Sequence, residues 1–506
     1  MKVLLVNTGQ YIPLSGYNYP ISAFQPAGIA YIANVLLKDN HKVSILDCLV
    51  EAYDHEEIRG EDKYIGLCDM EIKKRIKAFS PDVVGITIPF TSQARAGHEM
   101  AKLVKDINNK IPVVVGGSYP TTYIEKVLED DCVDFVVFGE GEITMSVLTK
   151  KFESKSRNFQ KVDGLAYKDK GIKINKARPL ILNLDDYLMA WDLLPMDKYF
   201  QAAYEVKSSR CVSTYGKKWA TIFTSRGCPF NCTFCVGHAV MGRKWRPRSV
   251  ENVIAEMDYL IKKYGIEHFD IEDDNFTLDK KRAKEICDAI IEKGWKIEWS
   301  TPNGIRADTV DEELIKKMKQ SGCVRTIVAP ESGDKWVIEN LMKKNIDLKQ
   351  VEQVVEWCKK YDIAIDAFFL IGMPGETREN VNQTIRYARK LRRKGIDECL
   401  FGIVVPHKGT EIYKIVVQNS WIKLKNGESE LVEKLARQET FIETPSLSIN
   451  EIKYLIKKAN RVNSLFPFSR LKLIIQMAIK TPKRFLQLII REIGKRLGFF
   501  EGKWGI

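Results

Sequence analysis

Three cysteines lie close together in the chain, at Cys228, Cys232 and Cys235 of the run S-R-G-C-P-F-N-C-T-F-C. This C-x3-C-x2-C loop follows an apolar run, Trp219–Phe223, which is typical of a β-strand. A loop this tight allows three thiolates to hold three corners of a cubane iron-sulfur cluster, and it leaves the fourth iron without a protein ligand. An iron with an open coordination position is a place where chemistry can occur.

Two simpler interpretations of the cysteines are a structural zinc site and three unrelated buried thiols. A structural zinc ion uses four protein ligands, usually as two separated pairs. The sequence contains no second C-x2-C or H-x3-H pair, and the only further candidate close by is His238. The spacing therefore favours an iron-sulfur cluster.

The aromatic residue before the third cysteine adds a family resemblance. With Phe234 in that place, the loop resembles the signature of the radical S-adenosylmethionine (SAM) superfamily. Later segments resemble, in chain order, the pattern of that superfamily's SAM site: Arg246–Ser249, Asp273–Thr277, Pro330–Gly333, Gly372–Glu376 and Pro406–Thr410, the last with Lys408 in place of a second proline. The resemblance implies a [4Fe-4S] cluster on the three cysteines and SAM contacts from Phe234, Glu331, Ser332, Gly372 and Gly375.

Individual residues in these segments have other interpretations. Glu331 is implied as the acceptor of the methionine ammonium of SAM. Asp273 and Asp274 could instead cap the helix that follows them. Arg246 and Arg248 could equally form surface or inter-domain ion pairs or contact a substrate.

The elements that must position these segments alternate between strand and helix from about residue 217 to 406. Six strand-helix repeats predict a partial parallel (β/α)6 barrel whose strand carboxyl ends form one open face. The expected strands after the first are 268–276, 296–300, 325–329, 364–371 and 398–405. The expected helices are 250–264, 280–293, 311–321, 349–361 and 378–394.

Residues 1–150 alternate in the same way, with near-continuous Val and Ile runs separated by helices. This pattern predicts a doubly wound, Rossmann-like α/β domain with a parallel sheet covered on both faces. Ligands of such sheets lie at the carboxyl ends of the strands. The expected strands are 3–6, 42–46, 82–88, 112–115 and 133–138, and the expected helices are 28–37, 70–79, 94–108 and 123–129.

Four segments of this domain, in order, look like the cobalamin-binding domain that precedes many radical SAM barrels: Pro26–Ala33, Val84–Thr87, Val115–Thr121 and Phe138–Glu142. The resemblance implies cobalamin contacts from Thr87, Gly116, Gly117, Ser118, Gly139 and Glu140. One departure is that Asn7–Pro13 stands where many such domains carry D-x-H-x-x-G, and no histidine precedes His41. Cobalt then lacks a histidine ligand from this loop, and residues 9–25 are expected to cover its face. The alternative is a vestigial domain that binds nothing.

Together the resemblances imply an enzyme in which the reduced cluster cleaves SAM to a 5′-deoxyadenosyl radical. With cobalamin, a methyl group from a second SAM would be transferred to an unactivated carbon, and a low-potential electron donor would be required. A radical SAM oxidoreductase or cyclase that transfers no methyl group is the alternative enzyme. An iron-sulfur or corrin carrier is the non-enzyme alternative. A methylthiotransferase is disfavoured, because Cys48, Cys68 and Cys132 are unevenly spaced for a second cluster.

Composition limits the setting. The 506 residues, 45% of them hydrophobic, predict about two to four soluble globular domains. Eleven cysteines are too few for a disulfide scaffold, and the cysteine loop needs reduced thiols, so a reducing, cytoplasmic location is expected. No apolar run is long enough to span a bilayer.

The chain is therefore expected to divide into a cobalamin-binding-like domain (1–150), a hairpin and linker (151–215), a barrel (216–410) and a helical C-terminal region (411–506). Within that region the tail 465–506 mixes aliphatic residues at helical spacing with Lys and Arg. Elsewhere in the chain, whose net charge is +13, Lys and Arg are mostly interspersed with Asp and Glu. Such a tail favours peripheral contact with an anionic membrane and hence a lipid or isoprenoid-like substrate. The alternative is a set of helices packed over the barrel mouth. Nucleic-acid binding is disfavoured, because it would leave much aliphatic surface exposed.

Overall fold

The N-terminal part of the chain folds into a sheet of seven strands, five of them parallel, in the order β10-β9-β8-β7-β6-β1-β3. The computed structural model describes residues 1–14, 23–204, 216–424, 427–436 and 439–463. An antiparallel hairpin extends the sheet at the β8 edge, within the segment for which a hairpin is predicted. The strands are β1 (Lys2–Asn7), β3 (Lys42–Asp47), β6 (Val83–Thr87), β7 (Val113–Gly116), β8 (Phe135–Val137), β9 (Leu165–Lys168) and β10 (Ile172–Ile174).

Both faces of this sheet are covered, as the apolar runs predict. In β1, Val3 and Leu5 face one core with α1 and α7, whereas Leu4 and Val6 face the other with α3 and α4. All four of these side chains are buried. The covering helices are α1 (Ala27–Lys38), α3 (Asp69–Phe79), α4 (Ala94–Ile107), α6 (Ile124–Leu128) and α7 (Glu142–Glu153).

Several short elements have no counterpart in the sequence prediction. A small antiparallel sheet joins three strands of four residues each, in which charged residues obscure the alternation of apolar and polar positions. These strands are β2 (Gln10–Pro13), β4 (Glu56–Arg59) and β5 (Asp62–Ile65). The short helices are α2 (Cys48–Glu51), η1 (Thr91–Gln93), α5 (Ser118–Thr122) and α8 (Met196–Tyr204).

The second sheet is the predicted partial barrel, with six parallel strands in sequential order. β14 ends at Ile271, five residues before the predicted end, and β15 runs on to Ile305. The strands are β11 (Trp219–Ile222), β14 (His268–Ile271), β15 (Glu298–Ile305), β16 (Cys323–Glu331), β17 (Ala364–Ile371) and β18 (Glu398–Ile403). The outer helices are α11 (Val250–Tyr264), α12 (Lys280–Lys293), α13 (Glu312–Gln320), α14 (Leu348–Lys360) and α15 (Arg378–Lys394).

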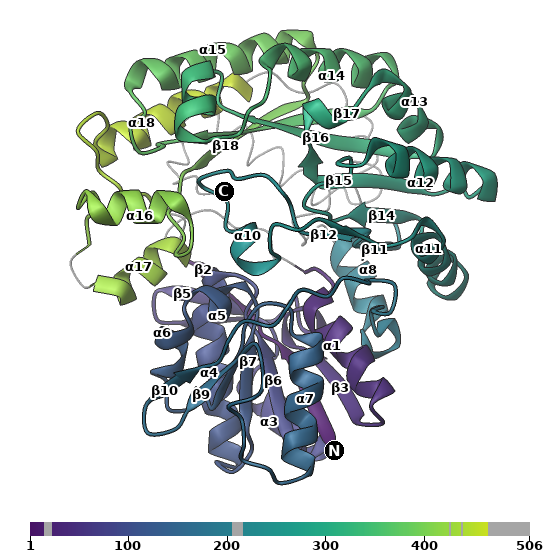
Figure 1. The fold of residues 1–506 in the computed structure, drawn as a ribbon, viewed down its shortest axis with the longest axis vertical. Helices are drawn as coiled ribbons and strands as arrows, with labels where there is room; N and C mark the ends of the chain where they lie inside the picture. Colours follow the sequence, from purple (N-terminus) through teal and green to yellow (C-terminus); the bar gives the residue numbers. More distant parts are fainter. Residues whose placement is uncertain (15–22, 205–215, 425–426, 437–438, 464–506) are drawn as a thin grey trace.

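The C-terminal helices contact both sheets (Figure 1). α18 (Ile449–Asn460) packs against β17 and β18 of the barrel. α16 (Glu411–Gln418) and α17 (Gly427–Ala436) instead contribute Val416, Leu431 and Leu435 to the core beneath the first sheet. The predicted membrane-binding tail, Leu465–Ile506, lies outside the described residues. Among the helices that the structure describes, no apolar segment reaches the length needed to cross a bilayer.

Candidate active site

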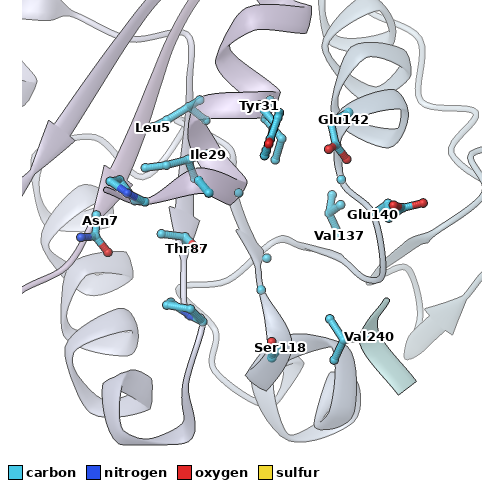
Figure 2. A pocket seen from close by; sticks show the side chains of 18 of the residues that line it. Leu5, Asn7, Ile29, Tyr31, Thr87, Ser118, Val137, Glu140, Glu142 and Val240 are labelled. Atoms are coloured by element: carbon cyan, nitrogen blue, oxygen red, sulfur yellow. The ribbon is translucent and has the colours of Figure 1, made fainter. Parts of the chain in front are cut away.

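One cavity of about 500 Å³ lies between the carboxyl ends of the first sheet and the barrel. All six residues predicted to contact cobalamin line it: Thr87, Gly116, Gly117, Ser118, Gly139 and Glu140. In Figure 2, Asn7 and Thr87 lie on one side of the cavity, and Glu140 and Glu142 lie on the other. The barrel contributes Thr221, Phe223, Arg226, Val240, Met241, Glu272 and Asn303. The two halves of the chain therefore share one site.

The chemistry of the cavity lining is suited to a corrin with amide side chains. Its inner part is apolar and reaches into the first core, where it is lined by Leu5, Val114 and Met145. Near the barrel, Gln93 Oε1 and Thr221 Oγ1 line the cavity, and both are buried without a hydrogen-bond partner among the described atoms. Buried polar atoms normally have partners, so these two are suited to pair with a bound ligand.

The glycine pair at the end of β7, Gly116 and Gly117, lets the backbone pass very close to neighbouring segments of the chain. Gly117 has a φ of 118°, and a Cβ atom there would lie 2.5 Å from the carbonyl oxygen of Ile88. A Cβ at Gly116 would lie 3.3 Å from the carbonyl oxygen of Val137. Only glycine fits at Gly117, because both the backbone conformation and the space exclude a side chain.

No histidine is found among the described residues that line the cavity. Asn7 lies at the end of β1, where the histidine-bearing loop of other cobalamin domains begins. Its Nδ2 donates to Asp47 Oδ1 at 3.1 Å, and the same carboxylate accepts from the hydroxyl of Tyr199. Burial raises the pKa of Asp47 to about 6. The side chain at this position is thus held by a fixed polar network in the first core.

The carboxylate of Glu140 is occupied by protein partners. It accepts from Arg246 Nη1 at 2.8 Å, from Arg226 Nη1 at 3.1 Å and from the backbone N–H of Ile181 at 2.8 Å. Arg248 forms a second buried pair, in which Nη1 lies 2.6 Å from Glu256 Oε2. Arg246 therefore forms an inter-domain ion pair, which was one of the two interpretations of the sequence. Arg248 instead forms a buried ion pair within the barrel, which neither interpretation predicted. The cobalamin contact of Glu140 stays a prediction.

Two aspartates hold the start of the cysteine loop. Asp273 accepts from the backbone N–H of Thr224 at 2.6 Å and from the Ser225 hydroxyl at 2.6 Å. Asp274 accepts from the backbone N–H of Gly227 at 3.1 Å. The helix-capping interpretation of these aspartates is wrong, because Asp279 caps α12. The turn of the chain at the end of β14 points the aspartates back toward β11 instead.

The rest of the loop is tied to the later strand ends. The backbone N–H of Thr233 donates to the Met342 carbonyl at 3.1 Å, and its hydroxyl donates to the Leu341 carbonyl at 2.6 Å. Phe234 packs with Met342 and Met373, which places the loop beside the Gly372–Glu376 turn. The guanidinium of Arg306 lies 3.5 Å from the ring centre of Phe230.

The three cysteines are free thiols in an environment that suits a bound cluster. Burial raises the pKa of each thiol, that of Cys235 to about 11. The positive charges of Arg306 and Lys344 act in the opposite direction on Cys228 and Cys232. The backbone N–H of Gly237 lies 3.3 Å from the sulfur of Cys235. These positive and N–H groups favour the thiolates that a cluster requires.

Beside the loop, a buried ion pair joins Glu331 to a lysine that the sequence pattern did not identify. Lys344 Nζ donates to Glu331 Oε1 at 2.6 Å, and both residues are buried. Glu331 has a φ of 63°, an uncommon conformation for a residue with a side chain. The methionine end of SAM carries an ammonium and a carboxylate, so adjacent opposite charges fit it. Lys344 could not be found by spacing, because it follows the irregular helix η4 (Val337–Leu341).

Replacing Glu331 with glutamine is expected to weaken SAM binding by about 10-fold or more, because a charge-assisted hydrogen bond contributes about 1.5–3 kcal/mol. The measurement is a SAM titration of the reduced cluster by electron paramagnetic resonance (EPR). Glu312→Gln, which alters an exposed pair with Lys360, is the matched control. Equal SAM affinity of Glu331→Gln and the wild type would contradict the assignment.

The fifth-strand turn is organised by a carboxyl group that the sequence prediction did not single out. Glu376 Oε2 accepts from the backbone N–H groups of Gly372 at 2.7 Å and Met373 at 3.1 Å. Gly372 and Gly375 have φ values of 93° and 94°, which glycine adopts without strain. The hydroxyl of Ser332 lies 2.8 Å from that of Thr384. Of the other predicted SAM residues, Gly372 and Gly375 thus lie in this turn, Ser332 is hydrogen-bonded to Thr384, and Phe234 is in packing contacts. Their contacts with SAM stay predictions.

This carboxyl group predicts a pH dependence of stability. Burial raises the pKa of Glu376 to about 7, so its contribution to stability is full below its unfolded pKa and is lost as the pH rises through 7. Between pH 5 and 8 the wild type is expected to lose about 2–3 kcal/mol relative to Glu376→Gln, which cannot titrate. Thermal unfolding of both proteins across this range measures the difference. Parallel pH profiles would show that Glu376 does not titrate in this way.

Comparisons with known proteins agree with this geometry. The B12 binding domain family matches residues 22–149, and the Radical SAM superfamily matches residues 222–388. The chain is 35% identical over 460 residues to an uncharacterised methyltransferase of Pyrococcus horikoshii, which covers 86% of this chain and 92% of the relative. It is 31% identical over 493 residues to the cytidylyl-2-hydroxyethylphosphonate methyltransferase of Streptomyces wedmorensis, which covers 91% and 89%.

More distant matches share the architecture. The anaerobic magnesium-protoporphyrin IX monomethyl ester cyclase of Synechocystis is 26% identical over 432 residues, covering 84% of this chain and 79% of the cyclase. The radical SAM methyltransferase TsrM from Kitasatospora setae, solved with cobalamin and a [4Fe-4S] cluster, superposes with a TM-score of 0.65 at 18% identity. That match covers 84% of this chain and 79% of TsrM, and it supports the fold alone.

These matches exclude two alternatives from the sequence analysis: an iron-sulfur or corrin carrier, and a vestigial first domain that binds nothing. The relatives at 31–35% identity align over most of their length and are methyltransferases. The described residues include the cavity, the cysteine loop and the strand ends that resemble a SAM site. The chain therefore belongs to the cobalamin-dependent radical SAM methyltransferases, enzymes whose cofactors are a [4Fe-4S] cluster, SAM and cobalamin.

Proposed function

We propose that this enzyme methylates an unactivated carbon of a small-molecule substrate by radical chemistry. The observation that carries the proposal is the shared cavity, because its lining combines the strand ends of the cobalamin-binding sheet with barrel residues next to the cysteine loop. A substrate carbon held there would lie between the two predicted cofactor sites. When bound, the cluster and SAM supply the substrate radical, and cobalamin supplies the methyl group.

The residues of the chain would bind and orient the substrate and exclude water. Glu272 and Asn303 line the barrel end of the cavity, and Asn303 Nδ2 donates to the backbone carbonyl of Glu272 at 2.9 Å. Their neighbours Asp273 and Asp274 are engaged with the cysteine loop, whereas Glu272 lies on the cavity. This pair is suited to accept hydrogen bonds from a polar group beside the reacting carbon. The Streptomyces relative, whose substrate carries a hydroxyethyl group, supports a polar substrate of this kind.

The number of SAM molecules consumed tests the proposal. The reconstituted enzyme is incubated anaerobically with a low-potential reductant, SAM and a small-molecule extract as the substrate source. Radical methylation requires S-adenosylhomocysteine and 5′-deoxyadenosine in about equal amounts, together with label from [methyl-14C]SAM in a product that survives acid. Formation of 5′-deoxyadenosine alone would instead support a radical SAM oxidoreductase or cyclase. The Synechocystis relative makes the cyclase the second candidate.

A lipid or isoprenoid-like substrate is a further proposal, and it rests on the tail 465–506. If this basic, aliphatic segment binds anionic lipid, removing it is expected to abolish flotation with anionic liposomes, because each basic residue contributes about 1 kcal/mol at such a surface. Liposomes of neutral lipid are the control and should bind neither form. Unchanged flotation of the truncated protein would remove the membrane interpretation and leave the site open to soluble substrates.

A further inference from the structure

Arg226 joins the cobalamin cavity to the cysteine loop. Its Nη1 lies 2.7 Å from Glu142 Oε1 and 3.1 Å from Glu140 Oε1, and its guanidinium carbon lies 4.5 Å from the ring centre of Tyr31. The side chains of Arg226, Glu140 and Glu142 are each less than one-tenth exposed. Tyr31, Glu140 and Glu142 belong to the N-terminal domain, whereas Arg226 belongs to the barrel. All four residues line the cavity. Arg226 is therefore a barrel residue that is held by the cobalamin-binding unit.

The two carboxylates that contact Arg226 belong to a single short loop. Residues 139–142 connect β8 to α7 and line the cavity along their whole length. Glu140 is also fixed by Arg246, whose Nη1 lies 2.8 Å from both of its carboxylate oxygens. Arg246 stands in β13 (Arg246–Pro247), which pairs with β12 (Ser225–Arg226). Glu140 of the loop is therefore bonded to both strands of the β12–β13 pair.

The segment that joins Arg226 to Cys228 of the cysteine loop has little freedom to move. Gly227 separates Arg226 from Cys228, and its backbone N–H donates to Asp274. A Cβ atom at Gly227 would lie 2.5 Å from the carbonyl oxygen of Lys244, so the chain is tightly packed there. Because packed segments transmit displacements instead of absorbing them, a shift of Arg226 must move Cys228.

We propose that Arg226 is a positioning residue that couples cobalamin binding to the geometry of the cluster loop. Cobalamin in the cavity fixes residues 139–142, and the two carboxylates then hold Arg226 and the start of the cysteine loop in the position that the cluster needs. Coupling between two binding sites is reciprocal, so assembly of the cluster must tighten cobalamin binding by the same factor. This inference concerns the two cofactor sites and does not depend on which carbon is methylated.

The test measures the dissociation constant of hydroxocobalamin by absorbance titration, with cluster-free and with cluster-loaded protein. In the wild type, the cluster is expected to tighten binding by about 5-fold or more, the lower end of typical coupling between sites. In Glu142→Gln and in Arg226→Lys this ratio is expected to fall to about 1, because the first variant removes one carboxylate charge and the second removes the planar guanidinium that lies over Tyr31 and reaches both carboxylates through Nη1. The ratio cancels any direct loss of cobalamin affinity.

A matched control separates coupling from general stability. Glu256→Gln alters another buried pair, Arg248–Glu256, whose side chains are 2% and 3% exposed and which does not line the cavity. It should keep the wild-type ratio. Mössbauer spectra of the oxidised, iron-57-labelled cluster provide a second readout: the quadrupole splitting should change on adding hydroxocobalamin in the wild type and in Glu256→Gln but not in Arg226→Lys. The proposal would be overturned by a wild-type ratio of dissociation constants of 1, or by a ratio that stays at the wild-type value in both Arg226→Lys and Glu142→Gln. Neither measurement requires substrate or turnover.

Discussion

Replacing any one of Cys228, Cys232 and Cys235 with alanine is expected to lower the rate of SAM cleavage by at least about 10³-fold, because a cluster cannot be held site-specifically by two thiolates. Iron and sulfide content after anaerobic reconstitution, the EPR signal of the reduced cluster and the yield of 5′-deoxyadenosine measure the loss. The effect should be the same at each position, since the chain is held before the loop by Asp273 and between Cys232 and Cys235 by Thr233, and it cannot rearrange to recruit another ligand.

Cys287→Ala is the control for this prediction. Its thiol is buried within the core of the barrel, and burial raises its pKa to about 12, so it stays protonated and binds no iron. The variant should keep its iron content and lose only packing stability. If one of the three loop variants retained four irons and normal SAM cleavage, that cysteine would not be a ligand and the assignment of the cluster site would be wrong.

Gly117→Ala is expected to lower the free energy of unfolding by about 3 kcal/mol and cobalamin occupancy by about 10-fold or more. Its Cβ atom would lie 2.5 Å from a backbone carbonyl at a φ of 118°, so the strand end must move. Because Gly116 and Ser118 beside it also line the cavity, this movement would distort the surface that is predicted to contact cobalamin. Absorbance of the bound cofactor and thermal unfolding report the two effects.

The matched variant is Gly171→Ala, in the turn between β9 and β10 of the same sheet and away from the cavity. Gly171 also has a positive φ, of 116°, but a Cβ atom there would meet nothing within 4 Å. Only the backbone strain of about 1–2 kcal/mol remains, and cobalamin occupancy should change little. Equal losses in the two variants would mean that backbone conformation alone, and not the close approach to Ile88, sets the requirement for glycine at position 117.

The regular architecture could be predicted from the sequence because it follows from local patterns. The amphipathic helices α11, α12 and α15 begin and end where the sequence predicts, since Ser249, Asp279 and Thr377 cap them. The cysteine loop could be predicted because a cluster constrains the spacing of its ligands. That the six residues predicted to contact cobalamin lie around one cavity could be predicted, because parallel strands bring their carboxyl ends to one edge.

The parts that could not be predicted depend on contacts between segments far apart in the chain. Asp273 looked like a helix cap because its partners, Thr224 and Ser225, lie nearly fifty residues earlier, and no local pattern pairs them. Lys344 follows an irregular turn, so its approach to Glu331 has no periodic signal. The ion pairs of Glu140 with Arg226 and Arg246 join the two sheets and arise only when both are folded.

The contribution of α16 and α17 to the first core has a consequence for synthesis of the protein. Leu4 and Val6 are made at the start of translation, yet Val416, Leu431 and Leu435 of the same core follow more than four hundred residues later. At ribosomal rates of about 5–20 residues per second, the part of this core that α16 and α17 cover stays exposed for about 20–80 seconds, although α3 and α4 already pack on the same face of the sheet. Expressed alone, the N-terminal unit should therefore expose the apolar residues on which α16 and α17 pack, and it should aggregate more readily than the whole chain.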